Sequence, residues 1–209
     1  MNPTPLLDLF AVESLWTEEQ SMVRDAVRAF SRRRFLPRVA ECYENETFPD
    51  DLIPEIGALG VLGANLEGYG CAGMDSASYG LAMRELEYVD SGLRSFVSVQ
   101  GALCMYPIHA YGSEAQREKF LPRMATGELI GCFGLTEPDS GSDPGSMRTR
   151  ATKVDGGYRL SGAKMWITNA PIAGVAVVWA KVDSDDPRSI RGFLVERGME
   201  GFSTPKMSG

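Results

Sequence analysis

The first half of the chain carries apolar residues at the three- and four-residue spacing that is typical of amphipathic helices. A first helix is predicted to begin after Thr17, which forms a capping-box pattern with Gln20, and its apolar face runs from Val23 to Phe30. The basic residues 32–34 indicate the C-terminal end of this helix, where the helix dipole favours cations.

Further helices are expected wherever a polar starting residue precedes the same spacing. We expect them from Asp50 or Asp51 to about Gly60, from Asp75 or Ser76 to Val89, from Ser91 towards Tyr111, and from Ser113, which forms a second capping box with Gln116.

From about Ile130 the pattern changes to short strand-like runs. The expected strands are 130–135, 149–154, 158–161, 165–168, 175–181 and 190–196. Gly156 and Gly157 predict a hairpin between two of them, because glycine readily adopts the positive φ that such turns need. Helices followed by strands predict an α+β protein with an N-terminal all-helical domain over 1–128 and a small antiparallel β-domain over 129–209.

Composition and charge exclude several classes of protein. With 44% hydrophobic residues and 23% charged residues, the 209-residue chain is typical of a globular protein. The net charge of −7 disfavours nucleic acid or a membrane surface as a partner. No apolar run is long enough to span a bilayer. The acidic N-terminus fits neither a signal nor a transit peptide, so we expect a cytoplasmic bacterial protein. Four scattered cysteines and one histidine predict no metal site.

The stretch CFGLTEPDSGSDPGS, residues 132–146, begins like a buried strand and abruptly becomes polar. Such a loop can offer backbone N–H groups and hydroxyls to a polar ligand, while its glycines permit a close approach. Composition alone does not distinguish it from an ordinary surface loop.

The order of residues is more specific. FGLTEPDSGSD, followed by KMWITN at 164–169, closely resembles the paired flavin-binding segments of acyl-CoA dehydrogenases, and the resemblance extends over nearly the whole chain. GYGCAG, ELEYVDSGLRSFVSVQ and IRGFLVERGMEG are most similar to the glutaryl-CoA-oxidising members of that family. Asp139 stands where those members more often have asparagine.

The resemblance implies FAD as the cofactor and assigns roles to both segments. Phe133 to Leu135 would lie beside the flavin ring, the Thr136 hydroxyl near its N5, and Ser142 towards the diphosphate and the CoA thioester. The complete set of implied flavin-binding residues is Phe133, Gly134, Leu135, Thr136, Glu137, Pro138, Asp139, Ser140, Gly141, Ser142, Trp166, Ile167 and Thr168.

Two acids in the loop, Glu137 and Asp143, invite interpretation as a general acid and base. A structural role is the better interpretation for Glu137: it lies in a turn before proline and can bind local backbone donors. In the family the resemblance implies that the catalytic base is a glutamate of the C-terminal helical bundle. That bundle is missing from this sequence, so no catalytic residue is assigned and activity of this chain alone is not expected.

Arg94 is the candidate residue for substrate selection. It falls in the first turn of the helix that Ser91 would cap, where the dipole disfavours a cation, and Asp90 offers a simple compensation. The resemblance implies instead that Arg94, with Ser95 and Ser142, binds glutaryl-CoA, with crotonyl-CoA and carbon dioxide as products. It also implies an electron-transfer flavoprotein as partner and a homotetramer. Another short or dicarboxylic acyl-CoA and a non-catalytic role remain alternatives.

Overall fold

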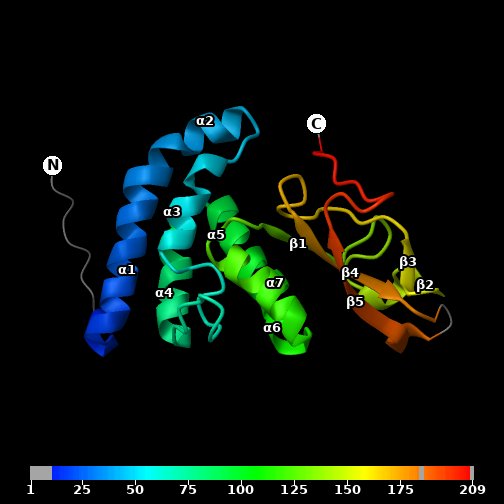
Figure 1. Cartoon of the computed structure of the whole chain (residues 1–209). Coiled ribbons are helices and arrows are strands. Elements are labelled where there is room, and N and C mark those ends of the chain that lie inside the picture. The colour runs from blue at the N-terminus through cyan, green and yellow to red at the C-terminus, as the bar shows by residue number, and fades with distance from the viewer. Residues whose placement is uncertain (1–10, 184–185, 208–209) are drawn as a thin grey trace.

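The chain forms a helical part and a sheet that lie side by side (Figure 1). The computed structural model describes residues 11–183 and 186–207. Its helices are α1 (Glu18–Phe30), α2 (Val39–Glu44), α3 (Ile53–Ala58), α4 (Ser76–Glu87), α5 (Ser91–Ser98), α6 (Tyr106–Tyr111) and α7 (Glu114–Ala125). Both predicted capping boxes are confirmed, with Thr17 before α1 and Ser113 before α7.

The basic residues 32–34 do not end the first helix. A π-helical segment (Ser31–Phe35) and a 3₁₀ turn (Leu36–Arg38) continue it into α2. Phe35 is buried, so the apolar face of the helix extends past the basic run. The three basic side chains are exposed, so solvent accommodates them on the outer face of the continuing helix, where Arg34 also pairs with Glu55 at 2.6 Å.

The helix that carries Arg94 begins one residue earlier than expected. Asp90, not Ser91, is its N-cap, because the Asp90 carboxylate accepts a hydrogen bond from Leu93 N–H at 2.8 Å. The predicted run towards Tyr111 is confirmed as α5, a π-helix (Val99–Met105) and α6 in direct succession.

The strands form one mixed sheet, so the expectation of an antiparallel domain is wrong. They are β1 (Gly131–Gly134), β2 (Arg150–Val154), β3 (Gly157–Ser161), β4 (Val175–Lys181) and β5 (Ile190–Glu196). The β2–β3 hairpin is confirmed, and β5 lies antiparallel along one edge of β4. Along the other edge, β1 and the first residue of β2 both pair with β4 in parallel. Parallel pairing requires a long crossover, and the 135–174 segment provides it.

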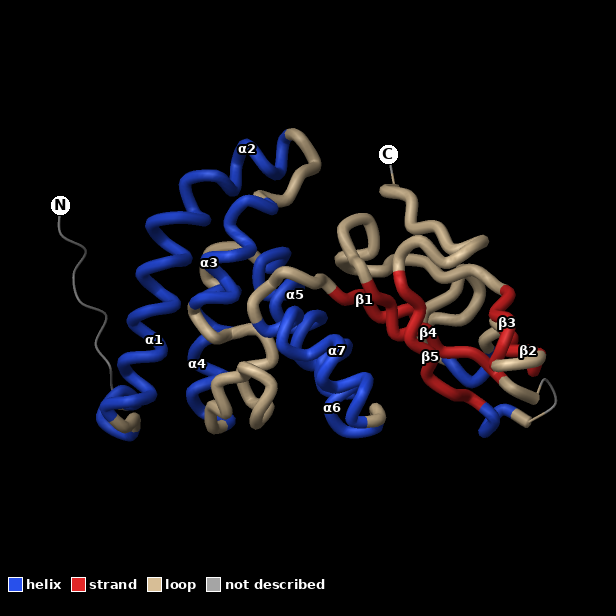
Figure 2. The backbone as a smooth tube through the Cα atoms, viewed as in Figure 1, coloured by secondary structure: helices blue, strands red, loops and turns tan. Residues whose placement is uncertain are grey.

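The predicted strand 165–168 is also wrong, because this segment is an irregular loop. Trp166 and Asn169 have φ of 62° and 68°, in the left-handed region that strands do not use. Ala170 N–H then bonds to Ile167 C=O and turns the chain. Loops of this kind make up much of the sheet part, as the tan segments of Figure 2 show.

The sheet and the helices share one hydrophobic core. Successive residues of β4 point to opposite faces: Val175 and Val177 pack with the helical core, whereas Ala176 packs with Cys132 and Val195 in a smaller cluster. Leu129 and Ile130 belong to the larger core and lead from α7 into β1. The prediction of N-terminal helices followed by a small sheet is thus confirmed. The domain boundary at 128/129 stays a prediction.

Candidate functional site

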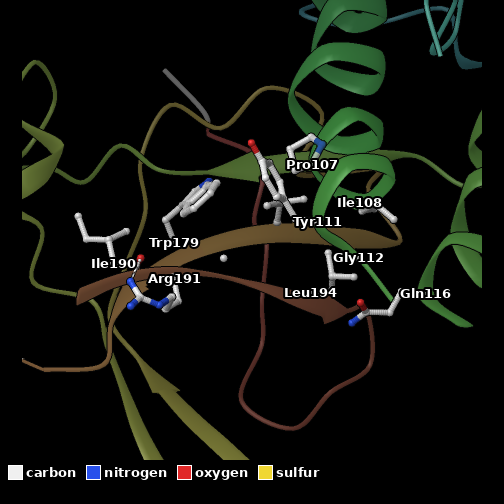
Figure 3. A pocket seen from close by; sticks show the side chains of 11 residues that line it. Pro107, Ile108, Tyr111, Gly112, Gln116, Trp179, Ile190, Arg191 and Leu194 are labelled. Atoms are coloured by element: carbon white, nitrogen blue, oxygen red, sulfur yellow. Dashed lines mark hydrogen bonds between the residues drawn. The ribbon is translucent and has the colours of Figure 1, made fainter. Parts of the chain in front are cut away.

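An apolar groove lies between the α6–α7 helices and the β4–β5 strands (Figure 3). It has a volume of about 440 Å³, and its walls include Tyr111, Trp179 and Leu194. None of the residues predicted as site residues lines this groove.

A smaller cavity, of about 170 Å³, brings the two motif segments together. Its lining residues are Val99, Leu103, Phe133, Leu135, Thr136, Trp166, Ile167 and Thr168. Six of these eight are in the predicted flavin-binding set. Segments about thirty residues apart therefore converge at the end of β1, against the π-helix that follows α5.

Backbone and amide contacts hold the second loop against the first. Met165 N–H donates to Thr136 C=O at 2.9 Å and joins the loops at the cavity. At the other end, the Asn169 amide donates to the carbonyls of Phe96 and Gly131 at 3.3 and 3.4 Å. Asparagine tolerates the left-handed backbone that this position requires.

The cavity presents a flat aromatic surface beside hydroxyl groups. Trp166 is 69% exposed, which is unusual for so large an apolar side chain, and its backbone holds it in the left-handed region. Among the described residues, no side chain or backbone group is hydrogen-bonded to the hydroxyl of Thr136 or Thr168. Apolar walls with unpaired hydroxyls suit a planar heteroaromatic ligand whose edge carries polar atoms.

Behind the first loop lies a buried ion pair. The Lys164 ammonium lies 2.8 Å from a Glu137 carboxylate oxygen, with 11% and 5% of the two side chains exposed. Glu137 also accepts hydrogen bonds from Arg148 N–H, Thr149 N–H and the Thr149 hydroxyl. Glu137 thus accepts backbone donors as predicted, but these donors are eleven and twelve residues away and not local.

The environment of this pair perturbs both ionisations. Burial alone would raise the pKa of the Glu137 carboxyl, but the hydrogen bonds from Lys164, Thr149 and the backbone outweigh it and lower the pKa to about 2. Burial lowers the pKa of the Lys164 ammonium, and the Glu137 carboxylate offsets this only in part.

The remainder of the predicted run 133–142 does not reach the cavity. Glu137 and Ser140 are buried and exchange two backbone hydrogen bonds in a tight turn. The exposed residues beyond the cavity wall are Pro138, Asp139, Gly141 and Ser142. Asp139 forms a solvent-exposed ion pair with Arg148 at 3.2 Å.

Arg94 lies on α5, outside the cavity lining, and its guanidinium is already engaged. Its Nε donates to Glu87 at 2.6 Å and its Nη1 to the Ser98 hydroxyl at 3.4 Å, while 37% of its side chain is exposed. It precedes the lining residue Val99 by five residues, about 7–8 Å along a helix. Ser95 is partly buried on the same helix. Arg94 thus retains guanidinium hydrogens for a further acceptor.

Four contributors to the site were not assigned from the sequence. Val99 and Leu103 are spaced four residues apart on one helical face, and that spacing could have identified them as a pair. Lys164 and Asn169 lie inside the KMWITN motif, but their partners are distant in the sequence.

The comparisons with known proteins agree with this architecture of N-terminal helices and a middle sheet. A model of the acyl-CoA dehydrogenase N-terminal domain matches residues 17–128, and one of the middle domain of the same family matches 132–209. The chain therefore belongs to the acyl-CoA dehydrogenase family.

Among solved structures, a glutaryl-CoA dehydrogenase from Mycobacterium smegmatis in complex with FADH2 is 51% identical, with a TM-score of 0.89 over 94% of this chain and 50% of that one. Butyryl-CoA dehydrogenase from Megasphaera elsdenii is 37% identical, with a TM-score of 0.84 over 90% of this chain and 51% of that one. An acyl-CoA dehydrogenase from Bacillus subtilis is 38% identical over 91% of this chain and 51% of its own length.

The chain spans about half the length of the curated relatives it matches. No helix in the described ranges 11–183 and 186–207 is long and apolar enough to cross a membrane. Residues 1–10, on which the expectation about leader peptides depends, lie outside the described part.

Proposed function

We propose that this chain forms the N-terminal and middle parts of an FAD-dependent acyl-CoA dehydrogenase. The convergence of residues 133–136 and 166–168 on one cavity supports this proposal most directly. FAD, when bound, would accept the hydride that leaves the acyl group, and with it both electrons of the oxidation. The aromatic surface of Trp166 and the free hydroxyls of Thr136 and Thr168 fit a flavin ring.

The contacts that this chain would supply to FAD are of two kinds. Phe133, Leu135, Trp166 and Ile167 would cover the ring and exclude water. Thr136 and Thr168 would donate hydrogen bonds to its polar edge. In our proposal Ser142, which is exposed outside the cavity, meets the diphosphate and the thioester.

The substrate that we propose is glutaryl-CoA, oxidised and decarboxylated to crotonyl-CoA and carbon dioxide. Two observations support it: the similarity to a glutaryl-CoA dehydrogenase, and the position of Arg94 on the helix that leads to the cavity. A guanidinium with unused hydrogens can bind the distal carboxylate of such a substrate, and Ser95 lies next to it. Electron transfer to an electron-transfer flavoprotein, assembly as a tetramer and a cytoplasmic bacterial location complete the proposal.

None of the carboxylates near the cavity is a suitable general base. Glu137 is buried in its ion pair, Asp143 accepts a hydrogen bond from the Ser146 hydroxyl, and Asp139 pairs with Arg148. A base must be free and positioned against the α-proton. We therefore propose that the base is supplied by a part of the protein other than the described residues.

Substrate selection by Arg94 is tested by comparing glutaryl-CoA with butyryl-CoA in the whole protein. Arg94→Gln should lower kcat/KM for glutaryl-CoA about 10- to 150-fold, the value of a hydrogen bond to a charged group, and change butyryl-CoA turnover little. Arg33→Gln, at an exposed arginine of the continued first helix, is the matched control. Equal losses with both substrates would refute the role of Arg94. If the whole protein bound no FAD, the proposed function as a dehydrogenase would be refuted, and a non-catalytic role would be favoured.

A further inference from the structure

Lys164 is a lysine whose charged end is withdrawn from solvent without lying in the cavity itself. Its ammonium donates to Glu137 at 2.8 Å and to the Leu135 carbonyl at 3.0 Å, with the Met147 sulfur at 4.0 Å. Withdrawing an ammonium from water is costly, so its contacts must compensate for lost hydration.

Neutralising Glu137 does not by itself account for this arrangement. Besides Lys164, the carboxylate accepts three hydrogen bonds from Arg148 and Thr149. A carboxylate with that many donors is stabilised in its charged form even without a cation. The second contact of Lys164, with Leu135, is directed to the cavity loop.

That second contact acts on the peptide group that connects two lining residues. The C=O of Leu135 and the N–H of Thr136 belong to the same planar peptide unit, and a hydrogen bond to the oxygen strengthens the N–H as a donor. The next residue, Met165, donates its N–H to the Thr136 carbonyl at 2.9 Å. Residues 164 and 165 therefore hold two successive carbonyls of the loop.

The loop is fixed on its inner side and left open on its cavity side. Both carbonyls point to partners within the protein, whereas no described residue accepts a hydrogen bond from Thr136 N–H or from its hydroxyl. A strengthened N–H donor on the cavity side favours a ligand that becomes more negative.

We propose that Lys164 is a positioning residue for FAD, which fixes the Leu135–Thr136 peptide and strengthens its N–H as a donor, so that the electron-rich reduced cofactor is favoured. This role rests on the proposed function, since it requires FAD in the cavity. Lys164 and Glu137, the two residues changed in the test, do not line the cavity, so the consequences of changing them can be separated from loss of a direct flavin contact.

The test compares three variants: Lys164→Met, Lys164→Met combined with Glu137→Gln, and Lys153→Met as a control at an exposed lysine of β2. Three quantities are measured: the urea stability of the FAD-free protein, the Kd for FAD, and the midpoint potential of bound FAD. The single variant should lose stability, because the charge on Glu137 loses its cation, and should bind FAD about tenfold more weakly, as expected when a charged donor is lost.

The double variant decides between the two roles. If Lys164 positions the loop, removing both charges restores part of the stability, since a glutamine amide keeps one of the two acceptor oxygens, but it does not restore FAD affinity, and the potential stays more negative than in the wild type. A tenfold loss of preference for reduced over oxidised cofactor corresponds to about 30 mV for a two-electron couple. The control should match the wild type throughout.

Two results would overturn the inference. Recovery of affinity and potential along with stability in the double variant would mean that Lys164 only neutralises Glu137. Unchanged affinity and potential in the single variant would exclude any action on the loop. If the wild type bound no FAD, the proposed function itself would fail, and this role with it.

Discussion

Gln100 provides the sharpest test of how the helical part is joined to the sheet. The side chain is completely buried, and its amide donates to the carbonyls of Met124 and Leu129 at 3.0 and 2.8 Å. Its oxygen accepts from Gly131 N–H at 2.7 Å. One glutamine thus connects the π-helix, the end of α7 and the first residue of β1.

Replacing it in Gln100→Met keeps the side-chain volume and removes the polar groups. Three groups lose their bond to Gln100, but Met124 C=O retains a hydrogen bond from Gly127 N–H, so two of them, Leu129 C=O and Gly131 N–H, are left unpaired. A buried unpaired group costs about 1–3 kcal/mol, and relaxation reduces the total, so we expect a loss of about 3 kcal/mol in the free energy of unfolding.

The assay is equilibrium unfolding in urea, with Gln116→Met as the matched control. The same chemical change there removes one exposed hydrogen bond, from Ser113 N–H at 2.8 Å, and should cost about 0.5–1 kcal/mol. Equal effects at the two positions, or a loss below 1 kcal/mol at Gln100, would show that the buried bonds are not what joins the two parts.

Two further predictions follow from the acids around the cavity. Because the folded pKa of Glu137 is about 2 and its ordinary value is 4.5, the pair's contribution should be complete above pH 4.5 and lost as the pH falls towards 2. At 1.36 kcal/mol per pKa unit, this shift corresponds to about 3 kcal/mol of the free energy of unfolding. In urea unfolding measured from pH 6 to pH 3, the free energy of unfolding should fall less steeply with pH in Glu137→Gln than in the wild type. The 209-residue chain supplied with FAD should not bleach the flavin on anaerobic mixing with glutaryl-CoA, because its nearby carboxylates are engaged; rapid stoichiometric bleaching would contradict this.

The sequence predicted those elements whose signals are local. Capping boxes lie within four residues, so the starts of α1 and α7 could be identified directly. β4 and β5 have the predicted bounds, because β4 is a continuous apolar run up to Ala180 and turn residues flank both strands. The end of the first helix was misjudged because exposed cations are tolerated within a helix as well as at its end, while buried Phe35 continues the apolar face past them.

Only those residues of the candidate site that the order of its two motifs identifies could be predicted from the sequence. Thr136 and Trp166 followed from that order, whereas the roles of Gln100 and Lys164 depend on partners about thirty residues away. A run of ten loop residues also could not be divided, from sequence, into those that face the cavity and those that face solvent. That division depends on the tight turn at 137–140.

The wrongly predicted strand explains why the two motifs meet. Met165 lies beside Thr136, just past one end of β1, and Asn169 beside Gly131 at the other. The 165–169 segment therefore runs back along β1 without forming a ladder with it. Since β1 and β4 are parallel, the chain must return to the start of the sheet before β4 begins, and this return carries Trp166 across the mouth of the cavity. A regular strand here would pair its backbone with β1, whereas the left-handed residues leave Trp166 exposed to a ligand.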